Sequence, residues 1–201
     1  MAITDAYATA AEYRGVVGKT DTAQDAAILT DLTAISRYLE KKLGRFFGKD
    51  AAAVARVYVV PAAGSRLWVD DLAEAPTTVK LDDTGDNTFA TTLETTDFEL
   101  WPLNADKGPE PRPHTRIDLA PWGSRFCFYP GERVQVTAKF GWPSVPAAIK
   151  SATIQLTAIL RLESPRATRR ISELEETIEA SPDAQSIVKY LLDGFKREHY
   201  V

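Results

Sequence analysis

The sequence has 201 residues, of which 44% are hydrophobic and 26% are charged, with a formal net charge of −4 at pH 7. This composition is ordinary for a globular protein that is long enough to bury a core. A mildly acidic chain is not drawn onto DNA by its overall field. Neither a signal peptide nor an apolar run of about 18 residues is apparent, so we expect no membrane span and a protein made in a reducing cytosol.

The first fifty residues predict two helices. Thr4 is a candidate N-cap for a helix over residues 5–17. A second helix is predicted over residues 23–43, because its apolar side chains advance by three or four residues along one face. Thr22 and Asp25 have the spacing of a capping box at its start. The apolar stripe of this helix consists of Ile28, Leu32, Ile35, Leu39 and Leu43.

From Val54 the period of the apolar residues changes to two, which is typical of strands. Residues 54–60 carry apolar side chains on both faces of the predicted strand. The runs 77–81 and 88–93 flank a loop of aspartate, glycine and asparagine, and therefore predict a hairpin. Pro102 to Pro113 is rich in proline and predicts an extended loop. Further strands are predicted at 67–69, 98–101, 115–119, 125–129 and 133–140.

The last sixty residues return to a helical pattern. Ser144 is the expected N-cap of an apolar helix that Pro165 ends. Residues 167–180 predict a further helix, and Pro182 opens a short amphipathic helix near the C-terminus. The predicted fold class is therefore α+β, with N- and C-terminal helices that form one bundle interrupted by a small antiparallel β-domain. The predicted domains are a helical core with a C-terminal arm (1–50 and 143–201) and a β-rich insertion (54–140).

Residues able to do chemistry are few in this sequence. It has two histidines, His114 in the proline-rich loop and His199 near the end, and one cysteine, Cys127, which is expected to be a buried apolar residue of a strand. Motifs of serine hydrolases, P-loops and zinc sites are absent. The acidic run from Asp82 to Asp86 fits a hairpin turn better than a calcium loop. The sequence therefore predicts no enzyme, no catalytic residue, no metal site and no cofactor.

Charge is unevenly distributed along the sequence. Residues 70–110 are strongly acidic, whereas the helical ends are richer in lysine and arginine. A solvated acidic surface that aids solubility is the simplest interpretation. Head-to-tail packing of oppositely charged ends, and an acidic channel wall to which DNA does not adhere, are the functional alternatives. Three arginines either pair with an acidic partner or lie on a solvated helix: Arg166, Arg169 and Arg170.

Several segments resemble the head-to-tail adaptor, or connector, proteins of tailed bacteriophages. Residues 136–150, VTAKFGWPSVPAAIK, are similar to that family in running a strand through Gly-Trp into Val-Pro and an apolar helix. Residues 21–25 and 38–47 resemble its opening helices, and residues 82–104 resemble the β insert of some members. Pro182-Asp183-Ala184 before the last helix also fits. Residues 166–180 depart from the pattern, because a charged helical stretch replaces an expected glycine-rich loop.

This resemblance implies a structural virion protein rather than an enzyme. Members form a ring, usually dodecameric, that binds beneath the portal, extends the DNA channel and offers a docking platform to the next neck or tail-completion protein. The implied location is the virion neck, after assembly in the cytoplasm of a bacterial host. DNA would pass through the channel without specific binding, and no membrane is involved. The alternative function is a β-sandwich module that binds sugar or calcium on a helical scaffold.

The last helix is the predicted site of contact with the portal or a neighbouring subunit, because an amphipathic helix near a terminus can bind a groove. Burial of the same side chains in the subunit's own core is the open alternative. The candidate interface residues of this helix are Val188, Leu191, Leu192 and Phe195.

Overall fold

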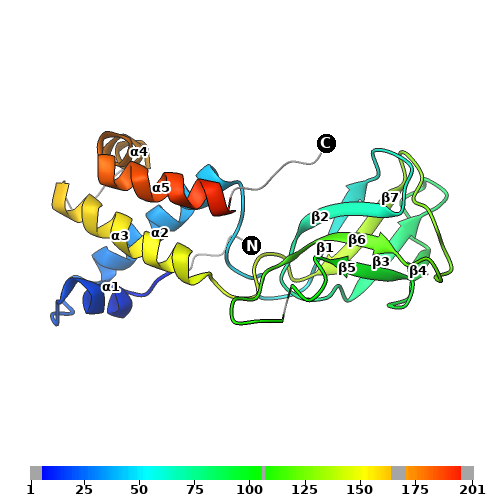
Figure 1. The fold of residues 1–201 in the computed structure, drawn as a ribbon, viewed down its shortest axis with the longest axis horizontal. Helices are drawn as coiled ribbons and strands as arrows, with labels where there is room; N and C mark the ends of the chain where they lie inside the picture. The colour runs from blue at the N-terminus through cyan, green and yellow to red at the C-terminus, as the bar shows by residue number, and fades with distance from the viewer. Residues whose placement is uncertain (1–5, 106, 164–170, 196–201) are drawn as a thin grey trace. The chain divides into compact units, whose positions relative to one another are not determined.

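The computed structural model describes residues 6–105, 107–163 and 171–195. These residues form five helices and seven strands, with helices toward both ends of the chain and the strands between them (Figure 1). Every paired strand runs antiparallel to its neighbour. The mixture of helices and antiparallel sheet that the sequence predicts is therefore confirmed. Within the described ranges, no helix is both long enough and apolar enough to cross a membrane.

Contacts along the chain divide it into two units. Of the described residues, 6–47, 145–163 and 171–195 form the helical unit, and 48–105 and 107–144 form the β unit. A helical unit built from both ends of the chain needs the helices after the strands to pack on those before them. Such packing is observed, because α2 (Asp25–Leu43) contacts α3 (Ala147–Glu163).

The first helix, α1, spans Ala10–Val17 and begins later than the sequence suggests. Thr9 is its N-cap and forms a complete capping box with Glu12. The Thr9 hydroxyl accepts a hydrogen bond from the Glu12 N–H at 3.2 Å, and the Glu12 carboxylate accepts one from the Thr9 N–H at 2.8 Å. The predicted cap, Thr4, lies outside the described residues. This reciprocal pair of hydrogen bonds sets where the helix begins.

The boundaries predicted for α2 agree with the structure, but its predicted cap is wrong. The N-cap is Gln24, which makes no side-chain capping bond. Thr22 instead closes a turn before the helix, because its carbonyl accepts from the Asp25 N–H at 3.0 Å. Gly44 ends the helix in the left-handed conformation, with φ 63°. The whole predicted apolar stripe is buried: Ile28, Leu32, Ile35, Leu39 and Leu43.

The helices of the helical unit share one interior. α2 contacts α1, α3 and α5 (Pro182–Phe195), and α4 (Ile171–Ala180) contacts its two neighbours in sequence. The helix α3 directs Ile149, Leu156 and Leu160 inward, where they are fully or almost fully buried. The apolar stripes seen in the sequence therefore face one another across this unit.

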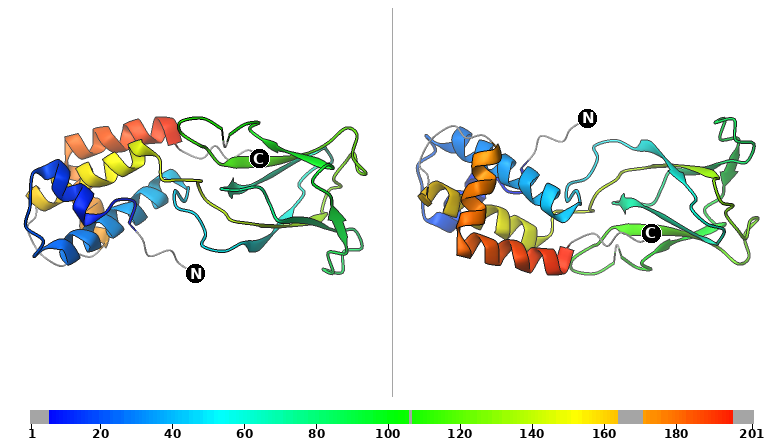
Figure 2. Two further views of the ribbon diagram at one scale, coloured as in Figure 1. Left: turned by 90° about the horizontal axis from the view of Figure 1, so that it is seen from below. Right: turned by 90° about the horizontal axis from the view of Figure 1, so that it is seen from above.

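The β unit has two sheets. The four-stranded sheet has the order β1-β7-β3-β4, and the three-stranded sheet has the order β2-β6-β5. Figure 2 shows the strands of this unit in two layers. The predicted hairpin is confirmed by the antiparallel pairing of β3 with β4. The strands are β1 (Val54–Val59), β2 (Arg66–Leu72), β3 (Thr78–Asp82), β4 (Thr91–Leu93), β5 (Phe98–Trp101), β6 (His114–Leu119) and β7 (Arg133–Ala138).

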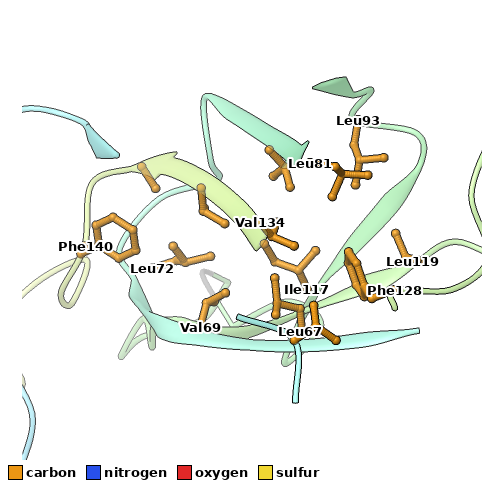
Figure 3. Packing of buried hydrophobic residues seen from close by; sticks show 14 residues of the cluster. Leu67, Val69, Leu72, Leu81, Leu93, Ile117, Leu119, Phe128, Val134 and Phe140 are labelled. Carbon is orange, nitrogen blue, oxygen red and sulfur yellow. The ribbon is translucent and has the colours of Figure 1, made fainter. Parts of the chain in front are cut away.

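Apolar side chains from both sheets fill the interior of the β unit. Leu67 and Val69 of β2 point toward Leu81 of β3 and Val134 of β7 (Figure 3). These side chains are at most 2% exposed. Because alternate residues of a strand face opposite sides, each sheet directs one apolar row inward and leaves the other row for solvent or for a partner.

One predicted strand is absent. Residues 125–129 form a loop in which only Phe128 makes a β-bridge, to Gly64. Alternating aromatic residues suggested a strand here, yet Phe128 is fully buried while Phe126 is 68% exposed. The side chain of Arg125 holds this loop by donating to Glu132 and to the Cys127 carbonyl. Contacts of the Arg125 side chain therefore hold this segment in place of the strand pairing that the pattern predicted.

Candidate interaction surface

The histidine and the cysteine of the β unit, the side chains best suited to catalysis or metal binding, both make contacts within the fold. His114 begins β6, is only 9% exposed, and has Nδ1 at 3.0 Å from the Pro102 carbonyl. It is therefore a buried residue of a strand, whereas the sequence placed it in the proline-rich loop. Cys127 is partly exposed rather than buried, and its thiol donates to the Phe128 carbonyl. Among the described residues, no group of three histidine, cysteine, aspartate or glutamate side chains could hold a metal ion.

The acidic run after β3 is bonded within its own turn. The Asp82 carboxylate accepts from the Asn87 N–H at 3.0 Å, and the Asp86 carboxylate accepts from the Thr88 N–H at 2.9 Å. Hydrogen bonds with the side chain and the backbone of Thr88 lower the pKa of Asp86. Such contacts are those of aspartates that stabilise a turn. The geometry agrees with the turn interpretation of this segment.

Other carboxylates of the acidic segment are paired with bases from outside it. Arg56 donates to Asp70 at 2.8 Å, and Lys49 donates to Glu74 at 3.0 Å. Arg125 donates to Asp83 at 2.6 Å. The fold thus brings distant basic residues onto the acidic segment, so its surface is less negative than the sequence alone implies.

A buried tyrosine joins three parts of the helical unit. The Tyr7 hydroxyl donates a short hydrogen bond to Glu40 of α2 and accepts one from the Phe47 N–H at 2.9 Å. The Tyr7 N–H donates to the Ser36 hydroxyl at 3.0 Å. Burial, followed by the contact with Glu40, raises the pKa of Tyr7. This network fixes the segment before α1 and the segment after α2 on the same helix.

Replacing Tyr7 with phenylalanine is expected to lower the free energy of unfolding by about 1–3 kcal/mol, because the buried Phe47 N–H loses its acceptor and the partly buried Glu40 carboxylate loses a donor. A raised folded-state pKa stabilises the fold below the unfolded pKa of 10.0, and this stabilisation is lost as the pH rises further. The difference in unfolding free energy between wild type and variant should therefore narrow above pH 10. Urea unfolding at neutral and at alkaline pH measures this difference.

The control for this experiment is Tyr190→Phe, because Tyr190 lies on α5 and is 71% exposed. It should leave the unfolding midpoint unchanged at both pH values. An equal loss of stability in the two variants would contradict the role given to the Tyr7 hydroxyl.

The predicted interface residues differ in their surroundings. Arg166, Arg169 and Arg170 lie outside the described residues, as does the side chain of Leu192. Val188 and Leu191 of α5 are 8% and 1% exposed, within the helical unit itself. For these two, the structure agrees with the alternative of burial in the subunit's own core. Phe195 is half-buried and packs edge-to-face on Phe47, with 5.8 Å between the ring centroids. An interface role for this set stays a prediction.

A hollow of about 200 Å³ lies where α2, α4 and α5 meet. Its wall is mainly apolar, and its rim carries an ion pair between Lys42 and Glu179 at 2.8 Å. Sites for small ligands usually measure 300–1,000 Å³ and hold convergent polar groups. The Lys42 ammonium also lies over the Tyr38 ring, 5.5 Å from its centroid. The hollow is therefore a packing feature of three helices rather than a ligand site.

The outer face of the three-stranded sheet carries an arginine between two tryptophans. The Arg116 guanidinium lies 5.1 Å from the Trp68 ring centroid and 4.9 Å from that of Trp101. Asp118 accepts two hydrogen bonds from Arg116, at 2.6 and 2.9 Å. Tryptophan and arginine are enriched in the energetically dominant parts of protein interfaces. The alternation of residues in β6 is a sequence signal that places Arg116 and Asp118 on one face, but it does not indicate that two tryptophans lie beside them.

The β unit also exposes a group of large apolar side chains. On β1 these are Val54, 47% exposed, Val57, 50% exposed, and Val59, 61% exposed. Isolated apolar side chains on a surface are common, but several on one edge strand indicate an interaction surface. The sequence held a signal for this surface, because residues 54–60 are apolar on both faces of the strand. Three aromatic residues of the loop after β6 are exposed as well: Trp122, Phe126 and Tyr129.

This chain resembles known proteins in its fold. No protein-family model matches the chain, and no curated protein matches it. A chain in the neck of an empty gene transfer agent (GTA) particle, computed with C6 symmetry, is similar in structure, with a TM-score of 0.54 and 18% sequence identity. The alignment covers 96% of this chain and 90% of that one.

A second similar chain comes from the virion of a native gene transfer agent particle. It has a TM-score of 0.50 and 18% identity, with 96% of this chain and 90% of that chain covered. At this level of identity the likeness shows a shared fold. Because the coverage is nearly complete, the helices and the strands of this chain both belong to the shared fold.

Proposed function

We propose that this protein is a non-enzymatic structural subunit of the neck of a tailed phage or a related particle. The observation that carries the proposal is the fold shared, over 96% of the chain, with a protein of a gene transfer agent neck. The sequence resemblance to head-to-tail adaptors supports it independently, since it rests on turn and packing residues rather than on the fold comparison. The described surface adds support, because it exposes large aromatic and apolar side chains that could contact other proteins.

In this proposal the subunits form a closed ring beneath the portal. The helices of both chain ends act as one bundle, and the ring extends the DNA channel without binding DNA specifically. The C6 symmetry of the similar neck structure is compatible with a ring of six or of twelve copies, and we propose twelve. The ring then provides the docking platform for the next neck or tail-completion protein.

The alternative of a calcium- or sugar-binding module rests on the β unit. The metal-like segment of this unit, Asp82 to Asp86, uses two carboxylates to accept hydrogen bonds from backbone N–H groups of its own turn. These contacts favour a turn over a calcium site, and they give no support to a second function.

The test is a deletion of the gene for this chain, followed by electron microscopy of the particles. We expect DNA-filled heads and free tails that no longer join, and recovery when the chain is supplied. Mass spectrometry and electron cryomicroscopy of intact particles should place the chain in a ring between portal and tail. Joined particles in the absence of the chain, or intact particles that lack it, would overturn the proposal.

A further inference from the structure

The β1 strand forms an edge of the four-stranded sheet and exposes an apolar row. Its outward-facing side chains are Ala55, Val57 and Val59, and all three are exposed. Edge strands of monomeric proteins usually carry charges, prolines or bulges that prevent pairing with another chain. The outward row of β1 has none of these, and β7 is its only partner strand among the described residues. This edge is therefore open to a further strand.

The backbone of β1 also points hydrogen-bonding groups toward the free edge. The Val60 N–H donates to the Glu132 carbonyl at 2.9 Å, and the Val60 carbonyl accepts from the Gly131 N–H at 2.9 Å. Because the direction of these groups alternates along a strand, Tyr58 also faces β7 whereas Val57 and Val59 face away from it. Among the described residues, neither Val57 nor Val59 makes a backbone hydrogen bond outside the paired strands. An extended strand is the partner that satisfies such groups.

The opposite edge of the same sheet has the direction required of this partner. β4 ends the order β1-β7-β3-β4, and each pair in that order is antiparallel. β4 consequently runs antiparallel to β1. A second copy placed with its β4 beside β1 continues the alternation of strand directions without a break. Because two different edges meet, the contact is head-to-tail, and its repetition generates a ring when the rotation closes.

We propose that β4 of one copy pairs with β1 of the next, so that the sheets of adjacent subunits become one continuous sheet around the ring. This inference rests on the proposed neck function, because it supplies the contact that would join the subunits of the ring. The partner is a second copy of this chain. The side chains of the incoming strand would flank Val57 and Val59 on the outer face of the sheet, and the backbone groups of both residues would gain partners.

A pair of cysteines tests this contact directly. Val57, Gln135, Lys80 and Thr92 form one row across the sheet, so Val57 and Thr92 lie on the same face at opposite edges. Three strand spacings separate them within one copy, about 14 Å, which is too far for a disulfide. In a Cys127→Ser background, any disulfide formed by Val57→Cys with Thr92→Cys must therefore join two copies.

Under mild oxidation we expect this double variant to give a ladder of linked subunits on a non-reducing gel. Pairing Thr92→Cys with Val16→Cys is the control, because Val16 is 67% exposed on α1 and lies outside the sheet. The control should give no ladder. If Val57→Cys alone forms linked dimers, two β1 strands pair with each other and the proposal is overturned. Equal ladders in the test and the control would also overturn it.

A proline at Val57 tests the backbone part of the contact. Its N–H faces the free edge, so proline should leave the pairing with β7 intact and block an incoming strand. We expect an association constant about tenfold lower by analytical ultracentrifugation, from the loss of a hydrogen bond and the steric block. Val57→Thr is the matched control, because it keeps the N–H and a β-branched side chain.

Tryptophan fluorescence checks that the proline variant still folds. If that variant does not fold, the cysteine pair alone tests the contact between β1 and β4. Association of Val57→Pro equal to wild type would overturn the edge contact. A wild-type chain that stays monomeric at every concentration would overturn it too. The neck role would stand in both cases, because it is tested by the presence of the chain in particles. Absence from particles would instead refute the proposed function.

Discussion

The Phe47→Ala variant is expected to lose about 3–5 kcal/mol of unfolding free energy in the helical unit. Phe47 is fully buried, and its ring packs edge-to-face on Tyr7 and on Phe195, with centroid distances of 6.0 and 5.8 Å. Removing the ring leaves a cavity between segments from both ends of the chain, and the aromatic contacts are lost as well. The loss should lower the urea midpoint followed by helical circular dichroism.

The control is Tyr190→Ala, which removes an exposed aromatic side chain from the same unit. Its free energy of unfolding should change by less than about 0.5 kcal/mol. If both substitutions cost the same, the burial of Phe47 does not determine the stability of the unit, and the prediction fails.

The Phe140→Ala variant is expected to have a similarly large effect on the β unit, about 3–5 kcal/mol. Phe140 is 1% exposed, and the Arg56 guanidinium lies over its ring at 3.9 Å from the centroid. The residue also forms a β-bridge to Leu72 of the other sheet. The substitution therefore opens a cavity between the sheets and removes a cation–π contact.

Tryptophan fluorescence is a suitable probe for this variant, because the protein's four tryptophans, Trp68, Trp101, Trp122 and Trp142, all lie in the β unit. Phe126→Ala is the matched control, since it makes the same substitution at a position that is 68% exposed. We expect an unchanged fluorescence midpoint for the control and a clearly lower one for Phe140→Ala. Equal midpoints for the two variants would contradict the packing described for Phe140.

The elements with long and regular patterns were predicted well from the sequence. The helix α2 was predicted almost to its boundaries, because its apolar spacing and Gly44 are local signals that do not depend on the rest of the fold. The β3–β4 hairpin followed from two β-rich runs around a turn of aspartate, glycine and asparagine. The strand predicted at 125–129 was wrong, because alternation in a short aromatic run does not distinguish a strand from a loop held by Arg125.

The candidate surface was predicted less well than the fold. The stripe of α5 was identified, but periodicity shows only that Val188 and Leu191 share a face, and not what covers it. In the structure both side chains are covered by the helical unit. Conversely, Val57 was placed on a strand without any indication that it lies on an edge. Position within a sheet depends on which distant strands pair, and those pairings join residues far apart in the sequence.

The sequence by itself determined the α+β class, the order of helices and strands, and a shortage of catalytic groups. Each of these follows from composition or from patterns within about 20 residues. The tertiary structure alone decided which apolar faces are buried, which edge of the sheet is open, and which bases neutralise the acidic segment. Such features arise from contacts between distant parts of the chain, as in the pairing of Arg125 with Asp83, and local periodicity carries no information about them.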